Sequence, residues 1–189
     1  MAFDLGSARH WAAELQSRAA FPGAVAVDAT MGNGGDTQSL CEWVGTQGRV
    51  YAFDVQPQAL KRTRERLLYA GVESRARLIL DSHENIGRYV CEKVDLAVFN
   101  LGWLPGAGKH ITTRLDSTLR ALDACLTLMR TGALLTVCAY PGHEEGEREL
   151  QGAIAWARAL PGSDYHAMVR AYLNQPNAAP VLLAVQKRR

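Results

Sequence analysis

The stretch VDATMGNGGDT, residues 27–37, decides the fold, because it joins a short apolar run to an amphipathic one through a glycine-rich turn. The apolar run at residues 24–30 predicts a buried strand, and residues 36–44 predict a helix. Gly32 and Gly34 allow the backbone to turn sharply and to approach a ligand closely. The free N–H groups that begin the helix would point towards that ligand. The turn therefore predicts a ligand-binding site, with a ligand-free strand–helix turn as the alternative.

The same turn distinguishes between two classes of cofactor. A dinucleotide fingerprint, G-x-G-x-x-G, would need a third glycine where the chain has Thr37. A carboxylate at Asp28 fits poorly beside a pyrophosphate but suits the ammonium group of a methionine moiety. Electrostatics therefore favours S-adenosyl-L-methionine over NAD, and an NAD-dependent oxidoreductase is the disfavoured alternative. The residues of the turn expected to bind the cofactor are Asp28, Met31, Gly32, Asn33, Gly34, Asp36 and Thr37.

Apolar runs and amphipathic stretches continue to alternate along the rest of the chain. The further predicted strands are residues 49–54, 75–80, 94–100, 133–140, 165–173 and 180–186. The further predicted helices are residues 57–69, 85–91, 112–129 and 144–159. This alternation indicates a mainly parallel seven-stranded sheet with helices on both faces and a C-terminal antiparallel hairpin at one edge. The α/β, Rossmann-like arrangement resembles the class I methyltransferase fold, in which ligands bind beyond the carboxyl ends of the strands.

Length and composition indicate a single domain over residues 1–189. The hydrophobic fraction of 48% and the charged fraction of 21% are ordinary for a globular protein. No apolar run approaches the ~20 residues of a membrane helix, and the first 20 residues carry charges where a signal peptide would be apolar. We therefore expect a cytoplasmic protein without a membrane partner.

Charge and cysteine usage narrow the set of partners. The net charge of +2 is too small for a strongly basic nucleic-acid binder, so an RNA would need a local patch. The basic side chains of residues 57–69 are interpreted as a solvated helix face. The four cysteines form no C-x-x-C pair, and three lie in apolar patterns, which predicts buried free thiols and no metal site.

Two more strand ends carry candidate cofactor ligands. Asp54 ends the second predicted strand, where a carboxylate can accept hydrogen bonds from both ribose hydroxyls, and Gln56 would lie next to the adenosine. Capping of the helix that begins at Pro57 is the alternative for Asp54. Ser82 and His83 end the third strand, where we expect groups beside the adenine. For Ser82, an N-cap of the next helix is equally well supported.

The fourth strand ends in Asn100, and Trp103 follows it in a glycine- and proline-containing turn. This turn resembles the N-P-P-Y motif of nitrogen-directed methyltransferases, with Leu101 and Gly102 in place of the prolines. In that chemistry the asparagine carbonyl oxygen accepts a hydrogen bond from an amine and aims its lone pair at the methyl group. Trp103 would stack on a nucleobase, a contact of about 1–3 kcal/mol. A turn around a core tryptophan is the alternative.

Other polar residues near strand ends are candidate substrate contacts. Lys109 and Arg114 could hold a phosphate backbone, although a solvated helix start is the commoner role for such charges. His143 follows the fifth strand and is a candidate base or substrate contact. Asn174 and Gln175, between the last two strands, could read the edge of a base. Turn chemistry is the alternative for these last three residues.

Taken in order, these motifs resemble a bacterial family labelled putative rRNA methylases. The family pattern is D-A-T-x-G-N-G-x-D-T, F-D-x-Q, Ser/Asp-His, N-L-G-Y-L-P-G, G-H-x-x-G and N-Q-x-N-x-P-P. It is matched in order by residues 28–37, 53–56, 82–83, 100–106, 142–146 and 174–180. The chain departs from it with Gly35 for a frequent histidine, Trp103 for tyrosine, GAGK at residues 106–109 and one proline in the last motif.

The resemblance implies an S-adenosyl-L-methionine-dependent N-methyltransferase. A characterised member methylates the aminomethyl nitrogen of 5-aminomethyl-(2-thio)uridine at the wobble position of tRNA, so the expected partner is the anticodon region. Asn100 would orient the amine, and His143 would assist with the proton. Methylation of rRNA or of a small-molecule amine, and RNA binding without catalysis, stay as alternatives. The sequence leaves the oligomeric state open, with a homodimer among the states it allows.

Overall fold

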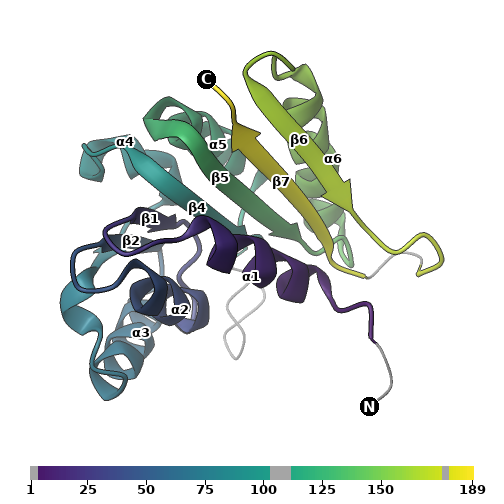
Figure 1. Ribbon diagram of the computed structural model, residues 1–189. Helices are drawn as coiled ribbons and strands as arrows, with labels where there is room; N and C mark the ends of the chain where they lie inside the picture. Colours follow the sequence, from purple (N-terminus) through teal and green to yellow (C-terminus); the bar gives the residue numbers. More distant parts are fainter. Residues whose placement is uncertain (1–3, 103–111, 176–178) are drawn as a thin grey trace.

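The computed structural model describes residues 4–102, 112–175 and 179–189. Within these ranges the chain forms a seven-stranded sheet in the order β3-β2-β1-β4-β5-β7-β6 (Figure 1). The strands are β1 (Val25–Asp28), β2 (Arg49–Asp54), β3 (Ala76–Leu80), β4 (Val94–Asn100), β5 (Met129–Ala139), β6 (Tyr165–Arg170) and β7 (Val181–Lys187). Strands β1 to β5 pair in parallel, and β7 pairs antiparallel with both β5 and β6. The predicted α/β sheet with a C-terminal edge hairpin is confirmed.

Helices cover both faces of the sheet (Figure 1). On one face lie α1 (Ala8–Ala19), α2 (Gly35–Val44) and α3 (Pro57–Tyr69); on the other lie α4 (Ile86–Tyr89), α5 (Leu115–Leu128) and α6 (Glu144–Ala159). Two 3₁₀ turns, η1 (Glu73–Arg75) and η2 (His83–Asn85), lead into β3 and α4. The three-layer arrangement explains why the central strands read as continuous apolar runs, since both of their faces are buried.

Side chains of the strands alternate between two buried layers. Phe53 and Phe99 belong to the layer beneath α5 and α6, whereas Val50, Leu96 and Val98 pack towards α2 and α3. Each of these side chains is at most 1% exposed, so each contributes about 1.5–3 kcal/mol of apolar burial. This two-sided core holds the carboxyl ends of the parallel strands in fixed positions.

The cysteines behave largely as the sequence predicted. Cys41, Cys125 and Cys138 are buried free thiols, whereas Cys91 is exposed. Burial raises the pKa of each buried thiol to about 12, so all three stay protonated near neutral pH.

Several element boundaries differ from the prediction: β6 ends at Arg170 rather than at residue 173, and the starts of α5 and β5 also differ. Helix α5 begins at Leu115 rather than at residue 112. Strand β5 begins at Met129, four residues before the predicted start, because Met129 already pairs with Val94. The register shifts between Val94 and Leu96, and Gly132 has a φ of 86°, so an irregular pairing extends the strand beyond its apolar run.

The helix α1 was not predicted. Its N-cap is Ser7, whose hydroxyl accepts from the backbone N–H of His10. Ala8, Trp11 and Ala12, at helical spacing, are buried against the sheet on the side of β5 and β7. Figure 1 shows α1 crossing that side of the sheet. The cap and the spacing were signals in the sequence, but the surrounding charges obscured them.

Strand order reverses between β1 and β4, because the chain builds β2 and β3 on one side of β1 and returns to the other. In open α/β sheets the crevice for a ligand forms at such a switch point, beyond the carboxyl ends of the strands. Strand β6 runs in the same direction as β5, so residues after Arg170 also lie at this edge.

Candidate active site

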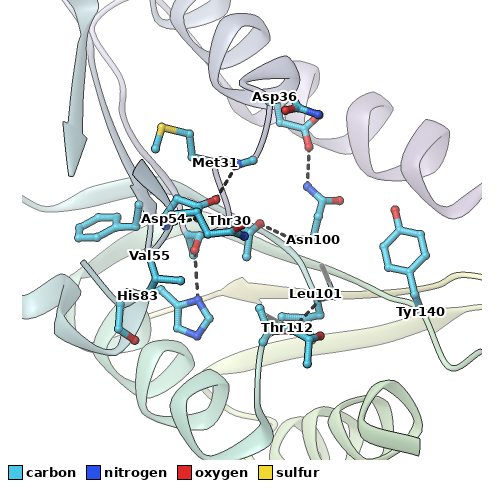
Figure 2. A pocket seen from close by; sticks show the side chains of 18 of the residues that line it. Thr30, Met31, Asp36, Asp54, Val55, His83, Asn100, Leu101, Thr112 and Tyr140 are labelled. Carbon is cyan, nitrogen blue, oxygen red and sulfur yellow. Dashed lines mark hydrogen bonds between the residues drawn. The ribbon is translucent and has the colours of Figure 1, made fainter. Parts of the chain in front are cut away.

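A cavity of about 770 Å³ lies at the carboxyl ends of β1, β2 and β4. This volume falls within the range of about 300–1,000 Å³ that is usual for small-molecule sites. The predicted site residues in its wall are Met31, Gly32, Asn33, Asp36, Asp54, Gln56, Ser82, His83, Asn100 and His143. Figure 2 shows Asp54, Asn100 and Tyr140, which come from the ends of β2, β4 and β5, around this cavity. The topology therefore gathers motifs that are far apart in the sequence.

The glycine turn is fixed to β2 by backbone contacts. The N–H of Met31 donates to the carbonyl of Phe53 at 2.9 Å, and the N–H of Gly32 donates to the Asp54 carboxylate at 3.0 Å. Gly32 and Gly34 have φ values of 55° and 77°, the left-handed region that favours glycine. A Cβ at Gly34 would meet the side chain of Thr63 on α3 at 2.7 Å. Gly34 thus packs against α3 and is not part of the cavity wall.

Asp28 lies beneath the turn rather than in the cavity wall. Its side chain is fully buried and accepts from the Thr37 hydroxyl at 2.6 Å and from the Thr30 N–H at 3.1 Å. Burial, together with the charge of Asp36, raises the pKa of Asp28 to about 7. The expected direct contact between Asp28 and a methionine ammonium has no support in this geometry. The acidic side chain of the turn that does face the cavity is Asp36.

Asp54 is the last residue of β2, and each of its two carboxylate oxygens accepts a hydrogen bond from a backbone N–H. One oxygen accepts from the Gly32 N–H and the other from the Gln56 N–H at 2.9 Å. Burial raises the pKa of Asp54, and the backbone N–H groups that it accepts from oppose the shift. A carboxylate has about four acceptor positions, so two remain for a ligand. No side-chain cap of α3 is formed at Gln56, its N-cap, so the capping alternative for Asp54 is not realised.

The motif after β3 combines the predicted N-cap with a place in the cavity wall. The Ser82 hydroxyl caps η2 by accepting from the Glu84 N–H, and Ser82 also lines the cavity. His83 is 7% exposed, and its Nδ1–H donates to the carbonyl oxygen of Ala29 at 3.1 Å (Figure 2). Burial lowers the pKa of His83, which keeps the ring neutral and leaves Nε2 as an acceptor. That atom has no hydrogen-bond partner within the described part of the chain.

Asn100 is held at the end of β4 from two directions. Its backbone N–H donates to the Thr30 hydroxyl at 2.7 Å, and its side-chain Nδ2 donates to Asp36 at 2.5 Å. Figure 2 shows both contacts at the edge of the cavity, with the Asn100 amide between Asp36 and Leu101. Arg9 of α1 forms an ion pair with Asp36 at 3.5 Å. These contacts join β1, α2, β4 and α1 around one amide group.

On either side of residues 103–111, the cavity wall includes Leu101, Gly102, Thr112 and Thr113. Trp103 and Lys109, predicted substrate contacts, lie outside the described residues. Gly102 and Thr113 meet through two hydrogen bonds, from the Gly102 N–H to the Thr113 hydroxyl and from the Thr113 N–H to the Gly102 carbonyl. The Thr113 hydroxyl donates in turn to Glu149, a fully buried carboxylate of α6. The two ends of the segment are therefore tied together and to α6.

His143 is the N-cap of α6 as well as a residue of the cavity wall. Its Nδ1 accepts from the Gly146 N–H at 3.1 Å, so the hydrogen of the neutral ring is on Nε2. In this state His143 is a hydrogen-bond donor rather than a base. Tyr140, the residue after β5, lines the cavity too, and burial raises the pKa of its phenol to about 12. The Tyr140 hydroxyl is therefore a neutral hydrogen-bond donor near neutral pH.

The other predicted substrate residues are not in the cavity wall. Arg114 is the exposed N-cap residue of α5, and Asn174 and Gln175 are exposed at the same edge of the sheet as the cavity. Conversely, Arg66 of the supposed solvated helix face lines the cavity and donates to the carbonyl of Asn33 at 2.9 Å.

Several residues of the wall were missed by the sequence reasoning. Arg9 was missed together with α1. Tyr140 was predicted only as the last residue of the fifth strand, although an aromatic at the carboxyl end of a central strand is a signal for this edge. Thr112 and Thr113 were interpreted as the start of a helix, because Gly102, the hydrogen-bond partner of Thr113, is eleven positions away in the sequence.

Residues 4–102, 112–175 and 179–189 contain neither a candidate metal site nor a candidate membrane span. No group of three or more histidine, cysteine or acidic side chains in these ranges has the arrangement of a metal site. Nor does any helix described there combine the length and the apolar character that spanning a membrane requires.

Comparisons with known proteins agree with this geometry. A tRNA (mnm(5)s(2)U34)-methyltransferase, chloroplastic, of Arabidopsis thaliana is 38% identical over 177 residues, 88% of this chain, and the chain spans 64% of that protein's length. A structure named as a putative rRNA-methylase from Clostridium thermocellum has a TM-score of 0.95 at 31% identity, covering 98% of this chain and 100% of that one. A Streptococcus mutans structure, named as a putative methyltransferase in complex with SAH, has a TM-score of 0.89 at 34% identity, covering 97% and 99%.

The family assignment covers the part of the cavity wall that runs from Phe53 to His143. The family model described as "Putative rRNA methylase" matches residues 50–186, which include β2 to β7 and all of α3 to α6. The structural relatives extend the likeness to the first strand and the glycine turn. The chain belongs to the Putative rRNA methylase family and has the Rossmann-like fold of S-adenosylmethionine-dependent methyltransferases.

Proposed function

We propose that this chain is an S-adenosylmethionine-dependent methyltransferase that acts on RNA, and that it methylates the aminomethyl nitrogen of 5-aminomethyl-(2-thio)uridine at the wobble position of tRNA. The observation that carries the proposal is the Asn100 amide, held at the end of β4 on the rim of a cavity that suits a nucleoside cofactor. The name of the Arabidopsis thaliana relative supports the choice of substrate.

The cavity fits S-adenosylmethionine by its size and by its acceptors. Asp54 has two free acceptor positions for the ribose hydroxyls, beside the exposed face of Val55 and the backbone of Gln56. Ser82 and His83 border the region expected for the adenine. When bound, the cofactor supplies an activated methyl group on a positively charged sulfur. The carboxylate of Asp54 gives the cavity wall a negative charge, which favours such a cation.

The residues of the cavity can orient an amine without a strong base. The Asn100 carbonyl oxygen would accept one amine hydrogen, which aims the nitrogen lone pair at the methyl carbon. The amine nitrogen would receive the methyl group that the bound cofactor supplies, and the resulting ammonium would lose a proton to water. An alkylamine near a cation has a lowered pKa, so it can arrive neutral. Tyr140 and His143 can donate hydrogen bonds to the base that carries the amine.

The RNA would extend from the cavity over the edge of the sheet. Arg114, Asn174 and Gln175 are exposed at that edge and stay candidates for contacts to phosphates and bases. Contacts of Trp103 and Lys109 with the RNA stay predictions from the sequence. A cytoplasmic location and a homodimer are likewise predictions, and the name of the plant relative contains the word chloroplastic.

The test uses the purified chain, S-adenosylmethionine and tRNA that carries 5-aminomethyl-2-thiouridine. We expect mass spectrometry of the tRNA nucleosides to find one added methyl group on that nucleoside, and we expect no methylation of free alkylamines. Asn100→Ala should lower kcat and leave the affinity for the cofactor nearly unchanged, because the lost hydrogen bond acts on the amine.

Two results would contradict the proposal. Methylation of rRNA or of free amines, with this tRNA unmodified, would assign the cavity to another substrate. Turnover of the tRNA by Asn100→Ala at the wild-type rate would move the acceptor site away from β4.

A further inference from the structure

The backbone of Asn100 does not determine which way its side-chain amide faces, that is, where the oxygen and the nitrogen lie. Rotation about the last torsion of asparagine is broad and roughly two-fold, so the oxygen and the nitrogen can exchange places at low cost. Methyl transfer by the proposed route needs the oxygen, an acceptor, on the side of the amine. Some neighbour must therefore select one of the two orientations.

Asp36 is the neighbour that makes this selection. Its Oδ2 lies 2.5 Å from the Asn100 Nδ2. An ionised carboxylate only accepts hydrogen bonds, so the amide can satisfy it only by presenting the NH₂ group. The opposite orientation would set the amide oxygen against the carboxylate oxygen. With Nδ2 committed to Asp36, Oδ1 is left to accept from a ligand in the cavity that both side chains line.

Asp36 is itself held in place from two sides. It lies in the first turn of α2, where the helix dipole favours a carboxylate. Its second oxygen, Oδ1, pairs with Arg9 of α1 at 3.5 Å. The Thr30 hydroxyl fixes the backbone of Asn100 at the same time. The amide is therefore positioned by groups from three separate elements before any ligand binds.

We infer from this geometry that Asp36 is a positioning residue, which orients the Asn100 amide so that its oxygen receives the acceptor amine. The inference rests on the proposed function, because it gives Asp36 a part in amine methylation. It differs from the sequence-based expectation that Asp36 binds the cofactor. It differs also from a role for Asp36 as a base, because an orienting acceptor need not take a proton.

The experiment compares Asp36→Leu and Asp36→Asn with the wild-type chain on tRNA that carries 5-aminomethyl-2-thiouridine. Asp36→Leu should lower kcat by about 10- to 100-fold, the effect of losing one charge-assisted hydrogen bond, with the Kd for S-adenosylmethionine within about threefold of wild type. Asp36→Asn should restore most of the rate, since an asparagine oxygen can still accept from Asn100. Glu42→Leu, an exposed acid on the same helix, is the matched control and should leave both values unchanged.

A double-mutant cycle separates positioning from general damage to the fold. In an Asn100→Ala background, Asp36→Leu should change kcat by less than about threefold, because the group that it orients is gone. An additive loss would overturn the inference. A weakened Kd for S-adenosylmethionine would assign Asp36 to the cofactor, and a loss in Asp36→Asn equal to that in Asp36→Leu would indicate a base.

Failure of the proposed function is visible in different measurements. If the wild-type chain does not methylate this tRNA, or if Asn100→Ala is fully active, the function or its acceptor site is wrong. If Asn100→Ala is impaired while Asp36→Leu is not, the function stands and only the role of Asp36 falls.

Discussion

The two halves of the cavity are built in different ways. The turn half comes from consecutive elements, β1, the glycine turn, α2 and β2, and short backbone contacts such as that of Met31 with Phe53 hold it together. The acceptor half combines Arg9, Asn100, Tyr140 and His143, which are brought from α1 and from the ends of β4 and β5. Local turn chemistry therefore determines the first half, whereas the second exists only once the whole sheet has formed.

The largest effect is expected from Gly34→Val in the turn half, where it should destabilise the fold rather than obstruct a ligand. The left-handed backbone at Gly34 costs a residue with a side chain about 1–2 kcal/mol, and the new Cβ would meet Thr63 of α3 at 2.7 Å. We expect the free energy of unfolding to fall by about 2–5 kcal/mol, measured by urea denaturation.

The neighbouring glycine supplies the matched control. Gly35 lies inside α2 without a left-handed φ, and a Cβ there would meet no atom within 4 Å. Gly35→Ala should therefore leave the stability unchanged or raise it slightly, since alanine favours a helix. Equal losses in Gly35→Ala and Gly34→Val would mean that contact with Thr63 is not what constrains the turn.

Asp54→Ala should produce the next largest effect, on affinity for the cofactor. Removal of a charge-assisted contact to the ribose costs about 1.5–3 kcal/mol, or roughly 10- to 150-fold in the Kd for S-adenosylmethionine. The measurement is titration calorimetry with the cofactor. Glu65→Ala, an exposed acid on α3, changes the net charge equally and should leave the Kd unchanged. If Asp54→Ala binds S-adenosylmethionine with wild-type affinity, the ribose does not contact Asp54 at the end of β2.

Sequence reasoning succeeded where a residue's role depends on its near neighbours. The bounds of β2, α3, β4 and α6 agree with the predicted ranges, because apolar periodicity and the caps at Pro57 and Gly71 are local signals. Asp54 and Asn100 were identified as site residues for the same reason, since each ends an evident strand and the carboxyl ends of parallel strands meet at one edge.

Sequence reasoning failed where the role of a residue depends on its burial or on partners that are distant in the sequence. Asp28 looked like a ligand contact, but the fold gives its oxygens to Thr37 and Thr30. His143 was predicted as a candidate base, but its Nδ1 already accepts a hydrogen bond from the Gly146 N–H. Arg9 could not be linked to Asp36 from the sequence, because the contact between them needs α1 to pack on the same face of the sheet as α2.

The buried acid beneath the turn half should make the stability depend on pH. The folded pKa of Asp28, about 7, is above its ordinary value of 3.8 because of burial and the nearby charge of Asp36. Between about pH 4 and pH 7 the folded chain therefore holds a proton that the unfolded chain has released, so the free energy of unfolding falls as the pH rises. One proton corresponds to a slope of at most about 1.4 kcal/mol per pH unit.

Asp28→Asn tests this dependence directly. An asparagine can accept from the Thr30 N–H and donate to the Thr37 hydroxyl, so the local hydrogen bonds survive. Urea denaturation between pH 4 and pH 8 should give a flatter profile for Asp28→Asn than for the wild-type chain. Parallel profiles would mean that Asp28 is ionised throughout this interval.

The smallest effect is expected from Arg9→Met, which probes how far α1 contributes to the acceptor half. The Arg9–Asp36 pair joins a side chain that is 60% exposed to one that is 29% exposed, and solvent-screened pairs are worth about 0.2–1 kcal/mol. We expect a loss of stability below about 1 kcal/mol and a fall in kcat of at most about fivefold, because the Thr30 and Asn100 contacts still hold the site. Arg18→Met, an exposed substitution in the last turn of the same helix, should change neither value. If kcat falls more than tenfold in Arg9→Met but not in Arg18→Met, α1 is essential to the acceptor half. If both variants have equal effects, the cause is a general weakening of the helix.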